Sequence, residues 1–278
     1  MSGTLFIVAT PIGNLEDLTS RARQTLVEVS LIAAEDTRHT GRLLMHIGCK
    51  TRLMALHDHN EEKIVGSIIE RLEAGDDVAL VSDAGTPLVS DPGFRLVRAA
   101  HEHDVVVSPI PGASAGIAAL SVAGIPTDRF CFEGFAPSKR IARKDWLEKL
   151  ASECRTIIIY ESVHRIVECL DDMVDIFGPD RQAFIGRELT KMHEQCIQES
   201  LQELQRQIGD GTIVRKGEFV IVVSGSTEGH ESPLEVDRLL RALCKHLSAK
   251  DAAKVAADAT GLKRNALYER LLELKDGL

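Results

Sequence analysis

The stretch that most constrains the fold of this chain runs from Val78 to Gly93, with the sequence VALVSDAGTPLVSDPG. Its first four residues are apolar and predict a short buried strand. A loop rich in Gly, Pro, Ser, Thr and Asp follows, and a helix is predicted from Phe94. Strand-to-helix connections usually need only about 2–6 residues. Open α/β sheets bind ligands at the carboxyl ends of their strands, so this long polar loop predicts a ligand site.

Strand and helix signals alternate along the whole first part of the chain. Such alternation predicts a parallel sheet with helices on both faces. Polar or Gly/Pro loops follow several of these strands, and we expect them to line one crevice at a single edge of the sheet. The predicted strands are 5–9, 31–34, 53–56, 78–81 and 105–107.

A second α/β pattern and a helical tail complete the chain. The second pattern has predicted strands at 130–134, 155–160, 182–186 and 217–223. The tail has only helical signals, arranged as helices around a Gly turn at 260–261. We therefore expect an α/β protein of three units, which are an N-terminal domain (1–123), a C-terminal α/β domain (128–226) and a helical extension (233–278).

Charge and cysteine content limit the class of protein. The formal net charge is −9, so a contact with nucleic acid requires a local basic patch rather than a general positive surface. The six cysteines are scattered without a C-x-x-C pair, which is typical of reduced thiols. The first residues have neither the charge nor the apolar length of a signal peptide. We expect a cytoplasmic protein without a membrane span.

Two common phosphate- and nucleotide-binding motifs are absent from the sequence. It contains no G-x-x-x-x-G-K-[ST] loop and no G-x-G-x-x-G dinucleotide-binding fingerprint. From the residues alone, the prediction is therefore a two-domain α/β enzyme with a small-molecule crevice.

Several short blocks carry a more specific resemblance. In chain order they are TPIGNL (10–15), AEDTRHT (34–40), LHDHNE (56–61), VSDAGTP (81–87) with SDPG (90–93), PGAS (111–114), YESVHR (160–165) and RELTK (187–191). With these blocks the chain resembles the ribosomal RNA 2′-O-ribose methylase branch of the tetrapyrrole methylase superfamily over nearly its full length.

The resemblance implies a fold, a cofactor and a reaction. Two α/β domains of tetrapyrrole-methylase type would bind S-adenosylmethionine in the cleft between them and methylate the 2′-hydroxyl of a cytidine in small-subunit ribosomal RNA, with a homodimer as the expected assembly. The substrate would be that RNA or the small ribosomal subunit. The implied cofactor contacts are Pro11, Gly13, Ser82, Asp83, Gly85, Thr86, Pro87, Val89, Ser114, Ala115, Glu161 and Thr190.

Two of the superfamily's loops are altered in this chain. The Gly-Asp-Pro element corresponds to Gly85-Thr86-Pro87, and the Gly-Pro-Gly first loop corresponds to Pro11-Ile12-Gly13. Asp83 lies near the position where the acid of the first element is missing, and the sequence leaves open whether it makes the contact instead.

A ribose hydroxyl is a poor nucleophile, so a base or a cation beside it would assist the reaction. The candidates are Glu35, Asp36, Arg38, His57, Glu188 and Lys191. Asp36 or Thr37 equally suits a helix N-cap. The segment His57–Glu61, which includes Asp58, has three interpretations: a metal site, a base or ribose contact, and a structural turn. The sequence gives no clear three-ligand set there, and we expect no metal.

Two basic regions are candidates for RNA contact. Lys139, Arg140, Arg143 and Lys144 form the densest basic cluster, and Lys263 and Arg264 begin the last predicted helix. The first cluster also suits a solvated helix start, and the tail also suits a packing or dimer element. Two other functions stay open: a metal-dependent phosphohydrolase centred on His57–Glu61, and a non-catalytic RNA-binding module.

Overall fold

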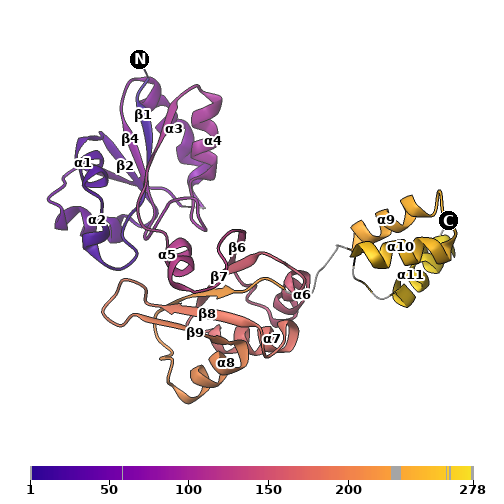
Figure 1. Cartoon of the computed structure of the whole chain (residues 1–278). Coiled ribbons are helices and arrows are strands. Elements are labelled where there is room, and N and C mark those ends of the chain that lie inside the picture. Colours follow the sequence, from indigo (N-terminus) through magenta and orange to yellow (C-terminus); the bar gives the residue numbers. More distant parts are fainter. Residues whose placement is uncertain (1, 58, 227–232, 261, 263, 277–278) are drawn as a thin grey trace.

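The computed structural model describes residues 2–57, 59–226, 233–260, 262 and 264–276. It contains two five-stranded sheets, each with its own helices, and a group of three helices at the C-terminal end (Figure 1).

The first sheet is wholly parallel, which confirms the prediction from the alternating pattern. Its strand order is β3-β2-β4-β1-β5. The strands are β1 (Thr4–Val8), β2 (Leu31–Ala34), β3 (Arg52–Ala55), β4 (Val78–Val81) and β5 (Val106–Ile110). All four residues of β4 are buried in the middle of the sheet, so the loop that follows it starts from the centre of the domain.

Helices cover both faces of this sheet. Alternate residues of each strand point to opposite faces, so Leu80 packs in one apolar cluster with α3 and α4, whereas Val81 packs in the other with α1 and α2. The helices are α1 (Ser20–Glu28), α2 (Thr37–His46), α3 (Glu61–Glu73), α4 (Phe94–Glu102) and α5 (Ala115–Val122), and a short 3-10 helix, η1 (Leu15–Asp17), precedes them.

Strand β5 extends further than the sequence indicated. Pro109 and Ile110 were expected in a loop, but they pair with Ile7 and Val8 of β1. Because β5 is an edge strand, the missing N–H of Pro109 breaks no pairing on the outer side.

The second sheet is mixed, with strand order β6-β7-β10-β8-β9. Only β6 and β7 run parallel, and the other neighbours are antiparallel. The strands are β6 (Phe130–Phe135), β7 (Thr156–Ser162), β8 (Gln182–Arg187), β9 (Gln195–Ser200) and β10 (Glu218–Val223). Strand β9 was not predicted, because its sequence QCIQES is polar and forms a largely exposed edge.

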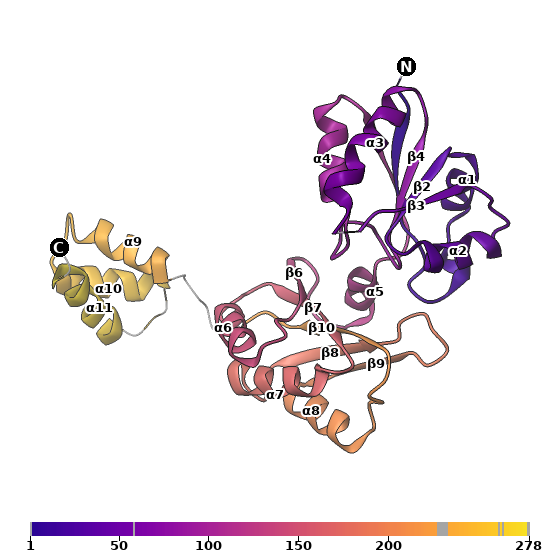
Figure 2. The same ribbon diagram turned by 180° about the vertical axis from the view of Figure 1, so that it is seen from behind.

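The two faces of the second sheet have different partners. One face is covered by α6 (Arg140–Leu150), α7 (Ile166–Phe177) and α8 (Leu201–Asp210). The other face meets the first domain, because Ala119 and Leu120 of α5 share an apolar cluster with Ile158, Phe184 and Val222. Helix α5 therefore lies between the two sheets in both views (Figures 1 and 2).

The C-terminal group has a small core of its own. Its helices are α9 (Pro233–Leu243), α10 (Ala249–Thr260) and α11 (Arg264–Asp276). Leu240, Ala252, Ala256 and Leu267 are buried among them. Arg264 is exposed at the start of α11, whereas the predicted contact Lys263 lies outside the described residues. No helix in the described part of the chain is long and apolar enough to cross a membrane.

The predicted basic cluster on α6 needs correction. Arg143 has no exposed surface, and its Nε lies 2.8 Å from the equally buried Asp172 Oδ2. Asp172 also pairs with Arg140 at 3.0 Å, and Lys144 pairs with Asp175 at 3.0 Å. The prediction that Arg143 contacts RNA is therefore wrong, because its guanidinium is used inside the domain. Within the described residues, Lys139 is exposed and has no ion-pair partner.

This buried pair gives a stability prediction. Replacing Asp172 by Asn removes the buried partner of Arg143 and leaves its guanidinium only Glu168, whose side chain is 65% exposed, so we expect a loss of about 3 kcal/mol in the free energy of unfolding. Arg140→Gln removes only the partner that is 63% exposed, and should cost at most about 1 kcal/mol. Urea unfolding at pH 7 measures both. An equal decrease in the free energy of unfolding of the two variants would show that the buried Arg143–Asp172 pair is no more important for stability than the exposed contact of Arg140.

Candidate functional site

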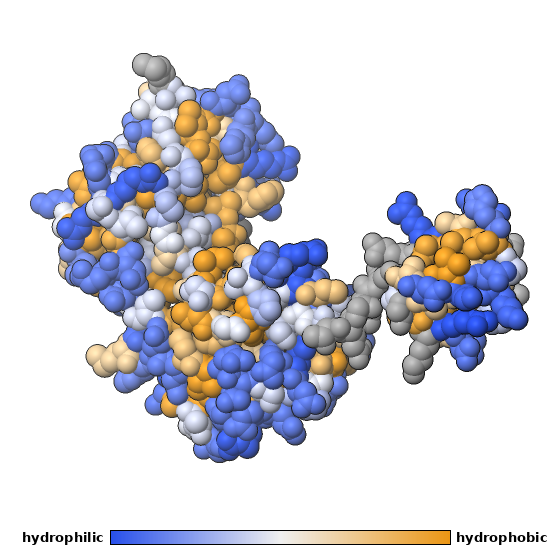
Figure 3. Space-filling view, viewed as in Figure 1, coloured by the Kyte–Doolittle hydropathy of each residue, from blue (hydrophilic) through white to orange (hydrophobic). Residues whose placement is uncertain are grey.

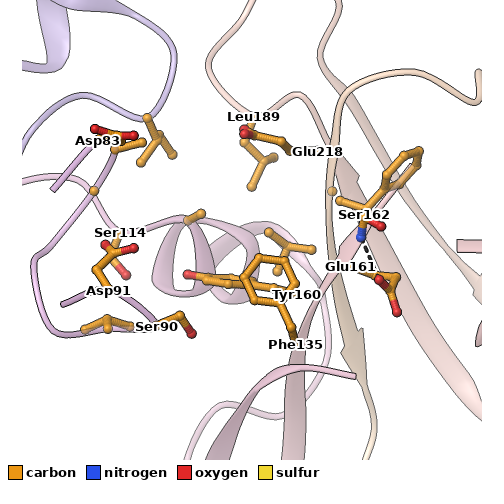
Figure 4. A pocket seen from close by; sticks show the side chains of 18 of the residues that line it. Asp83, Ser90, Asp91, Ser114, Phe135, Tyr160, Glu161, Ser162, Leu189 and Glu218 are labelled. Carbon is orange, nitrogen blue, oxygen red and sulfur yellow. Dashed lines mark hydrogen bonds between the residues drawn. The ribbon is translucent and has the colours of Figure 1, made fainter. Parts of the chain in front are cut away.

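A cavity of about 500 Å³ lies between the two sheets. Figure 4 shows it with the loop that carries Ser90 and Asp91 on one side and strands of the second sheet on the other. Both domains contribute to its lining, which consists of Ile12, Glu35, Asp83, Ala84, Gly85, Thr86, Val89, Ser90, Asp91, Ser114, Ala115, Phe135, Tyr160, Glu161, Ser162, Val163, Gly186, Leu189, Gly217, Glu218, Phe219 and Val220.

The loop after β4 is fixed by contacts with two neighbouring loops. Gly85 exchanges two backbone hydrogen bonds with Thr10, at 2.8 and 3.1 Å. Thr86 Oγ1 donates to the carbonyl of Ala113 at 3.0 Å. The residues 83–91 are thus held against both the first loop and the loop before α5, as the sequence predicted for strand ends that share one edge.

Seven of the twelve predicted cofactor contacts line this cavity. They are Asp83, Gly85, Thr86, Val89, Ser114, Ala115 and Glu161. Pro11, Pro87 and Ser82 do not line it. The side chain of Ser82 is buried, and its hydroxyl lies 3.4 Å from the carbonyl of Ala84.

Gly13 and Thr190, which were also predicted as cofactor contacts, instead join the two domains. The backbone N–H of Asn14 donates to Thr190 Oγ1 at 3.1 Å. A Cβ added at Gly13 would overlap Lys191 Cγ, so only glycine permits this close approach of the two loops. Ile12, which lies between the predicted contacts Pro11 and Gly13, is the residue of this loop that lines the cavity.

The carboxylate of Glu161 is engaged away from the cavity. Its Oε1 accepts a hydrogen bond from the backbone N–H of Ser162 at 2.7 Å and pairs with Arg165 at 2.8 Å. Neighbouring residues of a strand point to opposite faces, so it is Tyr160 that points toward α5 (Figure 4). The sequence identified the strand end and Glu161, but it did not single out Tyr160, which also lines the cavity.

The Glu35–Arg38 segment is divided between the cavity and the start of α2. Glu35 lines the cavity, and its Oε2 accepts from the backbone N–H of Asp83 at 3.5 Å. Asp36 is the N-cap of α2 and pairs with Arg38 at 2.8 Å. The hydrogen bonds from Arg38 hold the pKa of the Asp36 carboxyl well below its usual range. Asp36 therefore has the structural role that the N-cap interpretation proposed.

In the described part of the His57–Glu61 segment, His59 and Asn60 form a turn that leads into α3. The backbone N–H of His57 donates to Asn60 Oδ1 at 2.9 Å. Glu61 is buried, and its Oε1 accepts from the first N–H groups of α4, at Arg95 and Leu96. His57 does not line the cavity, and Asp58 lies outside the described residues. The described residues include no group of three His, Cys, Asp or Glu side chains able to hold a metal ion.

Lys191 is held at the rim of the cavity by two carboxylates. Its Nζ lies 2.9 Å from Glu188 Oε1 and 2.9 Å from Glu218 Oε2, and Glu218 lines the cavity. Burial lowers the pKa of Lys191, but the hydrogen bonds to the two carboxylates outweigh it, and the net shift is upward. Lys191 is thus a cation at neutral pH rather than a base.

The turn that carries Lys191 has a strained backbone. Glu188 and Thr190 have φ angles of 50° and 66°, in the left-handed region that non-glycine residues rarely adopt. Such conformations persist only where surrounding contacts hold them, and they concentrate at functional sites.

The apolar side of the cavity was not predicted from the sequence. Phe135, Tyr160, Leu189, Phe219 and Val220 come from the second sheet or the turn after β8. A strict two-residue alternation along 156–162 would have indicated Tyr160, whereas Phe135 and Leu189 follow from long-range packing and have no local signal.

Two family models match this chain. The family model for tetrapyrrole (corrin/porphyrin) methylases matches residues 4–205, and the model of the "RsmI C-terminal HTH domain" matches 230–275. The chain belongs to the tetrapyrrole methylase family. It is an S-adenosylmethionine-dependent methyltransferase.

Its relatives and structural neighbours agree with this assignment. Proteins named "Ribosomal RNA small subunit methyltransferase I" are 54% identical in Xylella fastidiosa (96% of this chain, 98% of that protein) and 50% identical in Pseudomonas aeruginosa (98% of each). Uroporphyrin-III-C-methyltransferase from Thermus thermophilus has the same fold, with a TM-score of 0.57 at 19% identity over 80% of this chain and 94% of the other. Diphthine synthase has a TM-score of 0.59 at 16% identity, over 80% and 90%. These findings support neither a phosphohydrolase nor a non-catalytic RNA-binding module.

The cavity fits S-adenosylmethionine by size and charge. Its volume is within the range of about 300–1,000 Å³ that small-molecule sites occupy. The lining includes the carboxylates of Glu35, Asp83, Asp91 and Glu218, and no Lys or Arg among the described residues. Negative charge beside a closed apolar wall favours a ligand that carries a sulfonium and an ammonium group.

The Thr86–Ala113 hydrogen bond gives a prediction about cofactor affinity. Thr86→Val keeps the side-chain volume but removes the donor, and we expect the affinity for S-adenosylmethionine to fall about fivefold, equivalent to about 1 kcal/mol. Thr86→Ser should bind nearly as well as the unmodified protein. Titration calorimetry measures these affinities.

Thr40→Val is the matched control for this experiment. Thr40 is a buried threonine of α2 whose hydroxyl has no partner among the described residues, and it lies outside the cavity. Its replacement should leave cofactor binding unchanged. Equal affinities for the Thr86→Val and Thr40→Val variants would show that the loop contact does not position the cofactor.

Proposed function

We propose that this protein transfers a methyl group from S-adenosylmethionine to the 2′-hydroxyl of a cytidine in small-subunit ribosomal RNA. The observation that carries the proposal is the full-length likeness to relatives named for small-subunit ribosomal RNA, together with an acidic cavity between two methylase domains.

We infer that the site works mainly by positioning. When bound, S-adenosylmethionine supplies the methyl group, which passes to the ribose 2′-oxygen as the carbon–sulfur bond breaks and the hydroxyl proton leaves. The loops that carry Thr86 and Ser114 are fixed to each other by the bond from Thr86 to Ala113, so the cofactor side of the cavity is already ordered. Holding two reactants in line can supply several kcal/mol of the barrier reduction.

Lys191 is our choice among the candidates for assisting the hydroxyl. Its ammonium group is fixed at the rim by Glu188 and Glu218, and the strained turn keeps it there. A positive charge at that position stabilises the negative charge that develops on the 2′-oxygen. Glu35 and Asp83, on the opposite domain, are the lining carboxylates that would face the cationic cofactor and accept the departing proton.

RNA would reach the site over exposed cations outside the cavity. Lys139, Arg140 and Arg264 remain candidates because they are exposed, and so does the partly exposed Lys144. The match of residues 230–275 to a helix-turn-helix domain supports a nucleic-acid contact by the C-terminal helices. The proposed substrate is the RNA or the small ribosomal subunit that contains it.

A homodimer and a cytoplasmic location stay predictions. Apolar residues gather on the surface over α5, where the two α/β domains meet (Figure 3). Ile117 and Val122 of this helix are 53% and 55% exposed. Exposed apolar groups of this kind suit contact with a second copy of the chain.

Transfer of a labelled methyl group tests the proposed reaction. Tritium from labelled S-adenosylmethionine should enter small subunits that lack the modification, and nuclease mapping should place it on the ribose of one cytidine. Label on a base, or none on RNA while the cofactor still binds, would contradict the proposal.

Replacement of Lys191 tests its assigned part in catalysis. Lys191→Met should lower kcat about a hundredfold with little change in affinity for S-adenosylmethionine, because the lost charge acts on the developing oxyanion. Single-turnover rates and calorimetry separate the two effects. Lys216→Met, which removes a neighbouring exposed lysine, should keep kcat. A normal rate for Lys191→Met would exclude the role.

A further inference from the structure

Phe135 is an aromatic residue that the proposed chemistry leaves unused. It lines the cavity, yet 54% of its surface is exposed. An apolar ring at the mouth of a site is costly to leave in water. Its position therefore suggests that a flat partner covers it during the reaction.

The ring of Phe135 stands on a rigid support. It packs edge-to-face against Tyr160, with ring centroids 5.6 Å apart, and Tyr160 packs in the same way on Phe132 at 4.9 Å. The hydroxyl of Tyr160 accepts a hydrogen bond from the backbone N–H of Gly116 at 2.9 Å, so the three rings are tied to α5. Figure 4 shows Phe135 and Tyr160 together on one side of the cavity.

The loop after β4 contributes the polar residues Ser90 and Asp91 to the lining of the same cavity. Strand β6 has a bulge between Phe132 and Gly134, and the φ of Gly134 is 68°. A Cβ at Gly134 would lie 3.4 Å from Ser90 Oγ, so the end of β6 lies close to the loop after β4. The Asp91 carboxylate next to Ser90 also lines the cavity. The ring of Phe135 and the carboxylate of Asp91 thus line the same cavity.

We propose that Phe135 stacks against the base of the nucleotide whose ribose is methylated, with the Asp91 carboxylate accepting a hydrogen bond from the exocyclic amino group of that base. This inference rests on the proposed function. Folded RNA is read mainly through unstacked bases placed on aromatic side chains. A carboxylate is the usual acceptor for the amino group of cytosine. The stacked base would hold its ribose at the mouth, beside the cofactor.

The alternative partner for the ring is the adenine of the cofactor, and the experiment distinguishes the two. Phe135→Leu keeps an apolar side chain but removes the ring, and Phe135→Tyr restores it. We expect Phe135→Leu to raise KM for small subunits about tenfold, which is within the effect of one base stack. Its affinity for S-adenosylmethionine should stay within about twofold, and Phe135→Tyr should resemble the unmodified enzyme.

Phe130→Leu is the matched control, because Phe130 lies on the same strand, is 40% exposed and does not line the cavity. Thermal unfolding verifies that both leucine variants fold. Weakened cofactor binding by Phe135→Leu with unchanged KM for RNA would assign the ring to adenine and overturn the proposal, as would no effect on either. Absence of methyl transfer by the unmodified enzyme would instead refute the proposed function itself.

Discussion

The site depends on the apolar contact between α5 and the second sheet. Ala119 and Leu120 pack against Ile158, Phe184 and Val222, so a helix of the first domain is part of the core of the second. Burial of this apolar surface away from water stabilises the arrangement of the two sides of the cavity. The hydrogen bond from the backbone N–H of Gly116 to the hydroxyl of Tyr160 fixes the orientation of α5 on the sheet, which apolar contacts alone do not define.

A second contact secures the other end of the cavity. There the loop at 13–14 meets the turn at 188–191 through Asn14 and Thr190. The ion pairs of Lys191 offset the strain of the left-handed residues in this turn. The turn places Lys191 at the rim of the cavity. Apolar packing at one end and polar contact at the other leave the opening between Phe135 and Asp91.

The sequence predicted the fold class well because its strands are short apolar runs separated by clear turn residues. It missed β9, whose polar edge sequence has no such signal. Residue motifs located the loops of the site, but they did not indicate the aromatic side chains beside them, such as Tyr160 next to Glu161. The burial of Arg143 depends on Asp172, which is 29 residues away and packs against it only in the folded domain.

The absence of Lys and Arg from the described lining of the cavity affects the end of each catalytic cycle. Methyl transfer converts a positively charged sulfonium into a neutral thioether. The same carboxylates that favour the reactant then lose one of the charges they interact with, and Coulomb attraction in a partly closed site is worth more than in bulk water. We therefore expect such a lining to hold the spent cofactor less tightly than the fresh one.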